Sequence, residues 1–404
     1  MLSMAFWEGH EVQSCREQSD GSLLIELSKD PKHEARCGAC GEPCALLHER
    51  SWRRVRERDW FDRRVWLRVP VRRMDCHHCG ARSIERIGWL HRHARLTERL
   101  RIWVEALAEL LPIAHVAKLT GLHWHTIKEI DKARLQRRFG AFERGNVRRL
   151  VMDEFALHKG HRYATVVMDA LTMRVLWVGE GNSREAIRPF FELLGKEGCW
   201  RIEAVAMDMN TAFDLEVRKH CPQAEVVYDL FHVVARFGRE VVDRVRVDQA
   251  NTLKEQPAAR QVIKRARWLL LRNRDNLAGD NLNAEQSIKL DELLAANAPL
   301  ALVYLLKTAL KEIWFAPSVR DGFRQWRSWY RMAIKSELPP VILFARRLRK
   351  YLRGILASAI YPMNSSILEG VNNKIKVIKR MAYGFRDSTY FFLKIKAAFP
   401  GKTR

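Results

Sequence analysis

Three carboxylates in this chain lie in or beside apolar segments, where a charge is costly unless it has a partner. Asp153 follows the apolar start of RLVMDEFALHKG, and Asp208 ends the apolar run of IEAVAMDMNTAF. Glu369 lies in NSSILEGVNNKIKVIKR, a segment predicted to be a helix. A few carboxylates bind hard divalent cations such as Mg²⁺, and two such ions about 3.5–4 Å apart can drive phosphoryl transfer. The three residues therefore predict a metal-dependent nuclease or DNA strand transferase.

The neighbours of these carboxylates limit which side chains can share one site. Glu154 follows Asp153 on a predicted strand. Successive side chains of a strand point to opposite faces, so only one of the two can take part. On the predicted helix, Asn372 and Lys376 lie three and seven residues after Glu369. They share its face and are candidates for holding phosphate oxygens.

Asp229 and His232, in VYDLFHVV, follow another predicted strand at the start of a helix. Asp229 has two interpretations that the sequence leaves open. It is a residue type that caps helix N-termini. It is also an accessory active-site candidate together with His232, which would contact the scissile phosphate.

Four cysteines form two C-x-x-C pairs near the N-terminus, with the spacing of a zinc site. Each pair lets two thiolates from one tight turn reach the same metal ion, and four thiolates leave no open position, so the zinc is expected to be structural. The predicted ligands are Cys37, Cys40, Cys76 and Cys79. Alternative ligands nearby are Cys44, His77 and His78.

The charge of the chain favours a polyanionic partner. The 404 residues include 71 Lys and Arg against 47 Asp and Glu, a formal net charge of +24. The basic residues are spread along the whole chain, which predicts that several domains contact one long nucleic acid. No apolar run is long enough to span a membrane, and the N-terminus lacks a signal pattern, so a cytosolic protein without membrane partners is expected.

The N-terminal third is predicted to hold a hairpin and a helix-turn-helix. WRRVRERDWFDRRVWLRVPVRRMDC alternates apolar and basic residues around a turn at Phe61-Asp62, which is typical of a β-hairpin with one basic face. Residues 96–140 show helical spacing, a stop at Pro112 and a turn at Gly121. This is the helix-turn-helix layout, with residues 123–136 as the candidate DNA-recognition helix.

Residues 148–235 alternate in an order that is typical of the ribonuclease H fold. Three strands are followed by helix, strand, helix, strand and helix. In that fold the first and fourth strands are neighbours, which would bring Asp153 and Asp208 to one edge of the sheet. Residues 240–360 are predicted to be almost entirely helical and to interrupt this fold. Their tryptophans are predicted to be core residues, with stacking on flipped bases as the alternative; they are Trp268, Trp314, Trp326 and Trp329.

The fold class that results is multidomain α+β. A zinc-binding β-hairpin module precedes a helix-turn-helix and a ribonuclease H-like α/β core that a helical insertion interrupts. The predicted boundaries are 1–92 for the zinc module, 93–145 for the helix-turn-helix, 146–238 for the first part of the core, 239–360 for the insertion, and 361–404 for the final core helix with the basic C-terminus.

Along nearly its whole length, the chain resembles bacterial insertion-sequence transposases of the ISL-three family. The resemblance includes the paired C-x-x-C module, the helix-turn-helix, DEFALHKGHRYATVVMD, MDMNTAF, VYDLFHVV and, most specifically, NSSILEGVNNKIKVIKRMAYGFRD. It implies a DDE core in which Asp153, Asp208 and Glu369 bind Mg²⁺ or Mn²⁺. Asp229 with His232 resembles the D-x-x-H element of related transposases that carry insertions.

The resemblance also implies partners and an activity. The expected enzyme binds the terminal inverted repeats of an insertion sequence, cleaves there and transfers the strand into target DNA. The expected partners are double-stranded DNA and further copies of the chain, as a homodimer or larger assembly at the bacterial nucleoid. The residues predicted to bind DNA after Glu369 are Asn372, Lys374, Lys376, Lys379 and Arg380.

Two other functions are compatible with parts of the pattern. A DNA-binding regulator would keep the zinc and helix-turn-helix modules and perform no chemistry. A structure-specific nuclease of the same fold would cleave DNA but leave no joined product. Metal-dependent cleavage separates the first from a transposase, and strand transfer separates the second.

Overall fold

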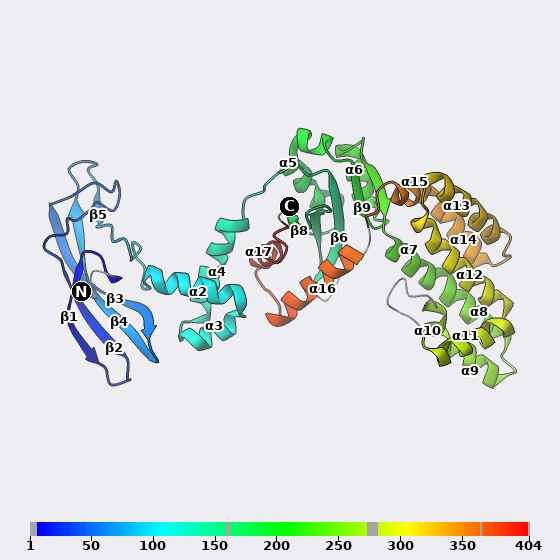
Figure 1. Ribbon diagram of the computed structural model, residues 1–404, viewed down its shortest axis with the longest axis horizontal. Helices are drawn as coiled ribbons and strands as arrows, with labels where there is room; N and C mark the ends of the chain where they lie inside the picture. Colours follow the sequence, from blue (N-terminus) through cyan, green and yellow to red (C-terminus); the bar gives the residue numbers. More distant parts are fainter. Residues whose placement is uncertain (1–5, 159–161, 273–281, 364–365, 403–404) are drawn as a thin grey trace. The chain divides into compact units, whose positions relative to one another are not determined.

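A computed structural model describes residues 6–158, 162–272, 282–363 and 366–402 (Figure 1). The chain forms two compact units, Met1–Arg138 and Phe139–Arg404. Among the described residues, no helix is long and apolar enough to cross a membrane.

The first unit begins with a five-stranded sheet. Its order is β1-β2-β4-β3, with β5 on β4, and its core contains Ile25, Leu27, Val55 and Leu67. The predicted hairpin is confirmed as the pair β3 and β4, which turns at Phe61, a residue in the left-handed region (φ 54°). The strands are β1 (His10–Glu17), β2 (Leu23–Lys29), β3 (Leu47–Trp60), β4 (Arg63–Asp75) and β5 (Arg82–Ile84).

Three helices complete the first unit, and the predicted helix-turn-helix is present. They are α2 (Glu98–Leu110), α3 (Ile113–Thr120) and α4 (Trp124–Phe139). Thr97 caps α2 through its side chain. Gly121 ends α3 in the left-handed conformation (φ 66°), which glycine adopts without a Cβ penalty. The candidate recognition helix α4 begins one residue later than predicted and ends three residues later.

The second unit is built around a mixed five-stranded sheet with the order β10-β9-β6-β7-β8. The pairs β6–β7 and β7–β8 are antiparallel, whereas β6–β9 and β9–β10 are parallel. The strand order along the chain is the one predicted, and β6 and β9 are neighbours as expected. The strands are β6 (Arg149–His158), β7 (Arg162–Asp169), β8 (Val175–Glu180), β9 (Ala204–Met207) and β10 (Glu225–Tyr228).

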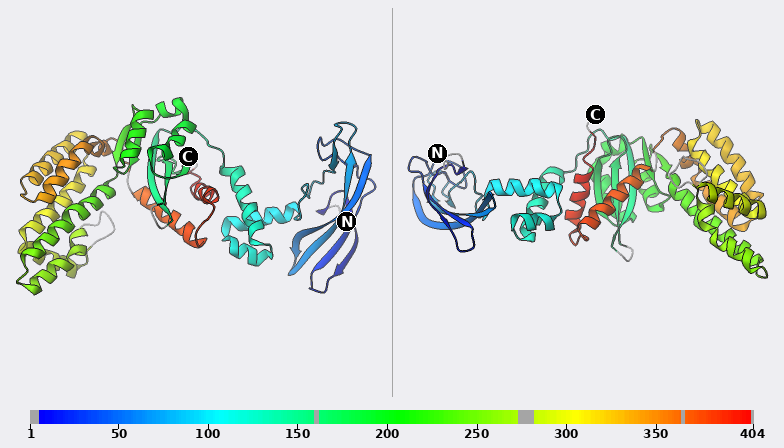
Figure 2. Two further views of the ribbon diagram at one scale, coloured as in Figure 1. Left: turned by 180° about the vertical axis from the view of Figure 1, so that it is seen from behind. Right: turned by 60° about the horizontal axis from the view of Figure 1, so that its bottom comes forward.

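Helices cover both faces of this sheet (Figure 2). One face packs on α5 (Arg184–Trp200) and α6 (Thr211–His220). The other packs on α16 (Ser366–Met381) and α17 (Ser388–Ala398). The helix α7 (Leu230–Phe237) leads away from the end of β10.

The segment between α7 and α16 is helical throughout its described residues. A π-helix, Gly238–Val242, joins α7 to the next helix. Trp314, Trp326 and Trp329 are buried, which supports the core interpretation for these three, whereas Trp268 is 67% exposed. The helices are α8 (Asp243–Thr252), α9 (Pro257–Arg265), α10 (Arg267–Leu271), α11 (Ala284–Ala296), α12 (Ala298–Glu312), α13 (Val319–Ile334), α14 (Pro339–Leu348) and α15 (Leu352–Leu356).

Candidate active site and zinc site

Three aspartates lie level with one another across neighbouring parallel strands, Asp153 in the middle of β6 and Asp208 and Asp229 directly after the ends of β9 and β10. The registers of β6, β9 and β10 make Val151, Ala206 and Val227 one row across the sheet. All three pack in the core that includes α16. Asp153, Asp208 and Asp229 each come two residues after a member of this row. Because side chains alternate between the faces of a sheet, the three aspartates belong to the same face as the row. The two predicted aspartates therefore share one edge of the sheet, and Asp229 joins them.

These carboxylates are crowded and poorly hydrated. Asp153 is 2% exposed and Asp229 is 7% exposed. Burial raises the pKa of Asp208 to about 6; His232 opposes the shift, and the charges of Glu154 and Asp153 add to it. Burial also raises the pKa of Asp153. A bound divalent cation stabilises buried carboxylates as anions, so the chemistry of these side chains suits such an ion.

Asn372 of α16 contacts this site directly. Its Nδ2 donates to Asp153 Oδ2 at 2.6 Å, while the backbone N–H of Glu154 donates to Asp153 Oδ1 at 2.8 Å. The Oδ1 of Asn372 is buried and has no hydrogen-bond partner among the described residues. Asn372 was expected to bind DNA, and the structure places it against a carboxylate of the candidate site.

The two interpretations of Asp229 are compatible with each other. Its Oδ1 accepts from the backbone N–H of Phe231 at 2.8 Å and so caps α7. Its Oδ2 lies 3.8 Å from His232 Nε2. One carboxylate thus fixes the start of the helix and faces the imidazole, and the imidazole lowers the pKa of both Asp153 and Asp208.

Glu369 lies in the first turn of α16, and its side chain falls outside the described residues. The backbone of α16 runs along the face that carries the aspartates, because Val371 and Ile375 pack against that face. Glu154 has a different partner, since its Oε2 accepts from Asn182 Nδ2 at 2.6 Å.

The basic residues after Glu369 differ in their surroundings. Lys374 Nζ donates to the carbonyl of Ala398 at 2.6 Å, and Lys379 Nζ donates to the carbonyl of Ala156 at 3.2 Å. Lys376 and Arg380 are exposed. Two of the predicted DNA contacts therefore also tie α16 to its surroundings.

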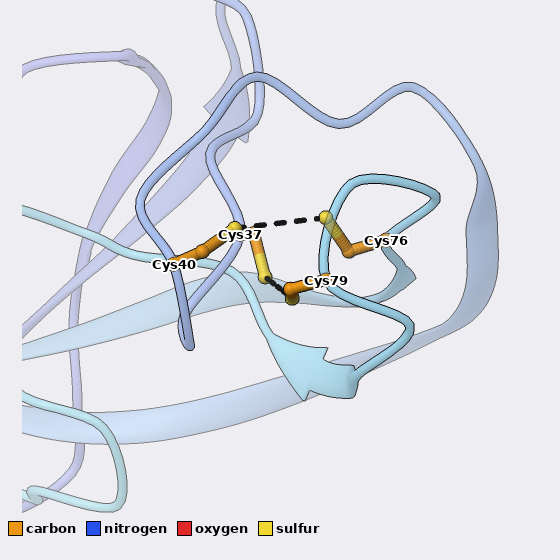
Figure 3. A group of neighbouring side chains, drawn as sticks. All are labelled: Cys37, Cys40, Cys76 and Cys79. Atoms are coloured by element: carbon orange, nitrogen blue, oxygen red, sulfur yellow. Dashed lines mark hydrogen bonds between the residues drawn. The ribbon is translucent and has the colours of Figure 1, made fainter.

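The four predicted zinc ligands meet at one point of the first unit (Figure 3). Their Sγ atoms all lie within 4.8 Å of one another. Cys37 Sγ lies 3.8 Å from Cys79 Sγ, and Cys40 Sγ lies 3.7 Å from Cys76 Sγ. Tetrahedral zinc with Zn–S bonds of about 2.3 Å places its sulfurs about 3.8 Å apart, so the cluster fits that ion.

The alternative ligands do not belong to this cluster, which is the single group of this kind among the described residues. Cys44 Sγ instead donates to the carbonyl of Asp75 at 3.2 Å. Ser83 was not predicted to lie at this site. Its hydroxyl is 3.5 Å from Cys37 Sγ and, with the backbone N–H groups of Cys40 and Ala39, lowers the pKa of that thiol to about 5. No local pattern marks Ser83, because it reaches the site only through the pairing of β4 and β5.

Three family models match successive parts of the chain. Residues 33–79 match the zinc-finger of transposases IS204, IS1001, IS1096 and IS1165. Residues 85–135 match the helix-turn-helix domain of transposase family ISL3, and residues 150–395 match the transposase domain of the same type.

Individual relatives agree with these matches. The chain is 49% identical, over 405 aligned residues, to the transposase for insertion sequence element IS1001 of Bordetella parapertussis, covering 100% of this chain and 98% of that protein. It is 27% identical to the transposase for insertion sequence element IS1557 in two strains of Mycobacterium tuberculosis, covering 87% of this chain and 83% of that protein.

Proposed function

The chain belongs to the ISL3 family and is a DDE-type DNA transposase, and from this premise we propose that Asp153, Asp208 and Glu369 form its active site with bound Mg²⁺. The observation that carries the proposal is the shared edge of β6, β9 and β10, where Asp153 and Asp208 lie level on the face covered by α16. Glu369 stands one helical turn before Asn372, whose amide reaches Asp153, so the same helix supplies the third carboxylate.

The sheet supports a ribonuclease H-like core. Three strands paired in antiparallel order are followed by two parallel strands on the other side of β6, with helices on both faces. The helical segment 239–360 then separates the strand that precedes Asp229 from the helix that carries Glu369. We infer that it is an insertion into this core.

The protein's own groups have distinct parts in the reaction. Asp153, Asp208 and Glu369 would hold Mg²⁺, which when bound would supply polarisation of the scissile phosphate and stabilisation of the attacking and leaving oxygens. Asp153 and Asp208 supply the anionic oxygens at the sheet edge, and Asn372 holds the carboxylate of Asp153 in one orientation. His232 lies 3.8 Å from Asp229 and its charge acts on Asp153 and Asp208, which supports a role in contacting the scissile phosphate.

Cleavage at the element's end leaves a 3′-OH, which then attacks target DNA. The first unit, with its zinc site and α4, recognises the terminal inverted repeats. Because two ends must be joined, a homodimer or larger assembly on DNA is part of the proposal.

Labelled DNA that carries the element's terminal repeats, incubated with Mg²⁺, tests this function. Wild type should yield cleaved and joined products, while Asp153→Asn and Glu369→Gln should bind the ends without cleaving them. Glu180→Gln is the matched control and should cleave, because that carboxylate is exposed at the end of β8. End binding without cleavage in wild type would favour the regulator, and cleavage without joined product would favour the nuclease.

A further inference from the structure

The helix α13 carries four arginines along one exposed face. They follow at intervals of four, three and four residues, which is one stripe of an α-helix. They are Arg320, Arg324, Arg327 and Arg331, and all are exposed. The opposite face buries Trp326 and Trp329 in the core of the second unit, so the orientation of the stripe is fixed.

Acidic residues do not neutralise most of this stripe. Asp321 is the single acidic residue of α13, and it pairs with Arg324 at 2.6 Å. Within the described parts of the chain, no carboxylate lies within ion-pair distance of Arg320, Arg327 or Arg331.

Some exposed cations on other helices, unlike these three arginines, have acidic partners. Arg218, Arg244 and Lys289 each pair with an acid four residues away on the same helix, at 2.9, 3.4 and 2.5 Å respectively. Like charges four residues apart destabilise a helix, whereas such opposite pairs stabilise it. Three cations without acids on one stripe of α13 therefore repel one another, and a polyanion would relieve that repulsion.

The stripe has the chemistry and the length for a DNA backbone. Arginine binds phosphate through two parallel N–H donors, which lysine cannot do. The eleven helical steps from Arg320 to Arg331 span about 16 Å. That length matches several phosphates of a duplex, whose charges follow at about 3.4 Å per strand along the axis.

We propose that the exposed face of α13 binds the phosphate backbone of duplex DNA, without reading its sequence. The inference rests on the proposed function in that the DNA is the transposase's own substrate. It adds a DNA contact within the helical segment, on a part of the chain other than the helix-turn-helix and the carboxylates.

The test compares two triple variants of the full-length zinc-loaded protein. Arg320→Gln/Arg327→Gln/Arg331→Gln removes the unpaired cations, and Arg218→Gln/Arg244→Gln/Lys289→Gln removes three exposed cations that have acidic partners. Both lower the net charge equally, so the control corrects for a general electrostatic effect. The affinity for a duplex with the terminal repeat and flanking DNA is measured over a series of salt concentrations.

Each lost phosphate contact should reduce the slope of log K against log[salt] by about 0.9. We expect the stripe variant to lose about 2 to 3 units of slope and at least about 10-fold in affinity at low salt, equally on a duplex of scrambled sequence. Equal slopes for the two triple variants would overturn the proposal. Melting curves check folding, and Arg327→Gln alone should lose about one unit, so the proposal stays testable if the triple variant is unstable.

The two proposals can fail separately. Asp153→Asn should abolish cleavage and keep the wild-type salt slope. If wild type does not cleave but the stripe variant still loses slope, the active-site proposal fails and the DNA contact of α13 stands. If cleavage depends on the carboxylates but the two triple variants have equal salt slopes, the active-site proposal stands and the DNA contact of α13 fails.

Discussion

At the residue scale, the proposed site is a set of carboxylates whose negative charges oppose one another. Asp153 and Asp208 have raised pKa values chiefly because they are buried, and each also feels a neighbouring carboxylate. Asn372 and His232 oppose this effect at Asp153, the first by a hydrogen bond and the second by its charge. The protein therefore keeps an arrangement that burial makes costly, and under the proposed function a bound cation offsets that cost.

The first prediction concerns stability without divalent metal. The native pKa of Asp208 is about 6, above the value of 3.8 for a free side chain, so the folded protein binds the proton more tightly. Wild type should lose stability as the pH rises from about 4 to about 6, and the loss should then stay constant. Asp208→Asn mimics the protonated form. The free energy of unfolding of this variant should therefore exceed that of wild type by an amount that grows through this pH window to at most about 3 kcal/mol.

Melting curves across this pH range, without Mg²⁺ and without a chelator that would remove zinc, measure the difference. An advantage that is the same at pH values below and above the window would show that Asp208 does not titrate there.

The second prediction separates two roles of Asn372. If its amide positions Asp153, Asn372→Ala should lower cleavage by about 10- to 100-fold and raise the Mg²⁺ concentration required, as for other groups that orient metal ligands. Binding to the ends should be unchanged. Asn373→Ala, at the exposed neighbouring position, is the control. Weaker end binding with an unchanged Mg²⁺ requirement would instead assign Asn372 to DNA contact.

At the element scale, local patterns predicted much of the fold. Alternation along β3 and β4 located the hairpin turn at Phe61-Asp62, and Gly121 located the turn of the helix-turn-helix. The strand order of the second unit placed Asp153 and Asp208 on neighbouring strands, which the pairing of β6 with β9 confirms.

What the sequence did not predict depends on long-range pairing. The parallel pairing of β2 with β4 joins segments about forty residues apart, and no periodicity within either segment indicates it. The hydrogen bond from Asn372 to Asp153 spans 219 residues. Gly195 breaks the helical conformation inside α5 (φ 72°), a local event that the apolar spacing on either side conceals.

The third prediction concerns how elements are joined within the first unit. Glu57 of β3 is 1% exposed and accepts from Trp7 Nε1 at 3.0 Å and from the Thr97 hydroxyl at 2.9 Å. Thr97 also caps α2, so one carboxylate links the sheet to the first helix of the helix-turn-helix. Glu57→Ala leaves buried donors unpaired and should cost about 2–4 kcal/mol of unfolding free energy.

Denaturant unfolding and binding to the ends measure this effect. Glu49→Ala is the matched control on the same strand, because its carboxylate is exposed and its ion pair with Arg73 is long at 3.9 Å; it should cost less than about 1 kcal/mol. Equal effects of the two substitutions would show that the buried link contributes little.

At the scale of the whole molecule, the DNA-binding elements and the carboxylates lie in two different units with separate cores. The first, Met1–Arg138, holds the zinc site and the helix-turn-helix, and the second, Phe139–Arg404, holds the carboxylates. The net charge of +24 belongs to a protein whose substrate is a polyanion. Binding should therefore weaken steeply with salt, whereas under the proposed function the chemistry depends on a few carboxylates and a bound metal.

The most direct test of the central claim is metal-specific rescue at Asp208. A thiolate binds Mn²⁺ better than it binds Mg²⁺, so Asp208→Cys should change which ion supports the reaction if that side chain is a metal ligand. We predict that Asp208→Cys fails to cleave the terminal-repeat DNA with Mg²⁺ and recovers with Mn²⁺, and that Asp208→Ala is inactive with both. Cleavage by Asp208→Ala, or equal activity of Asp208→Cys with the two ions, would contradict the account.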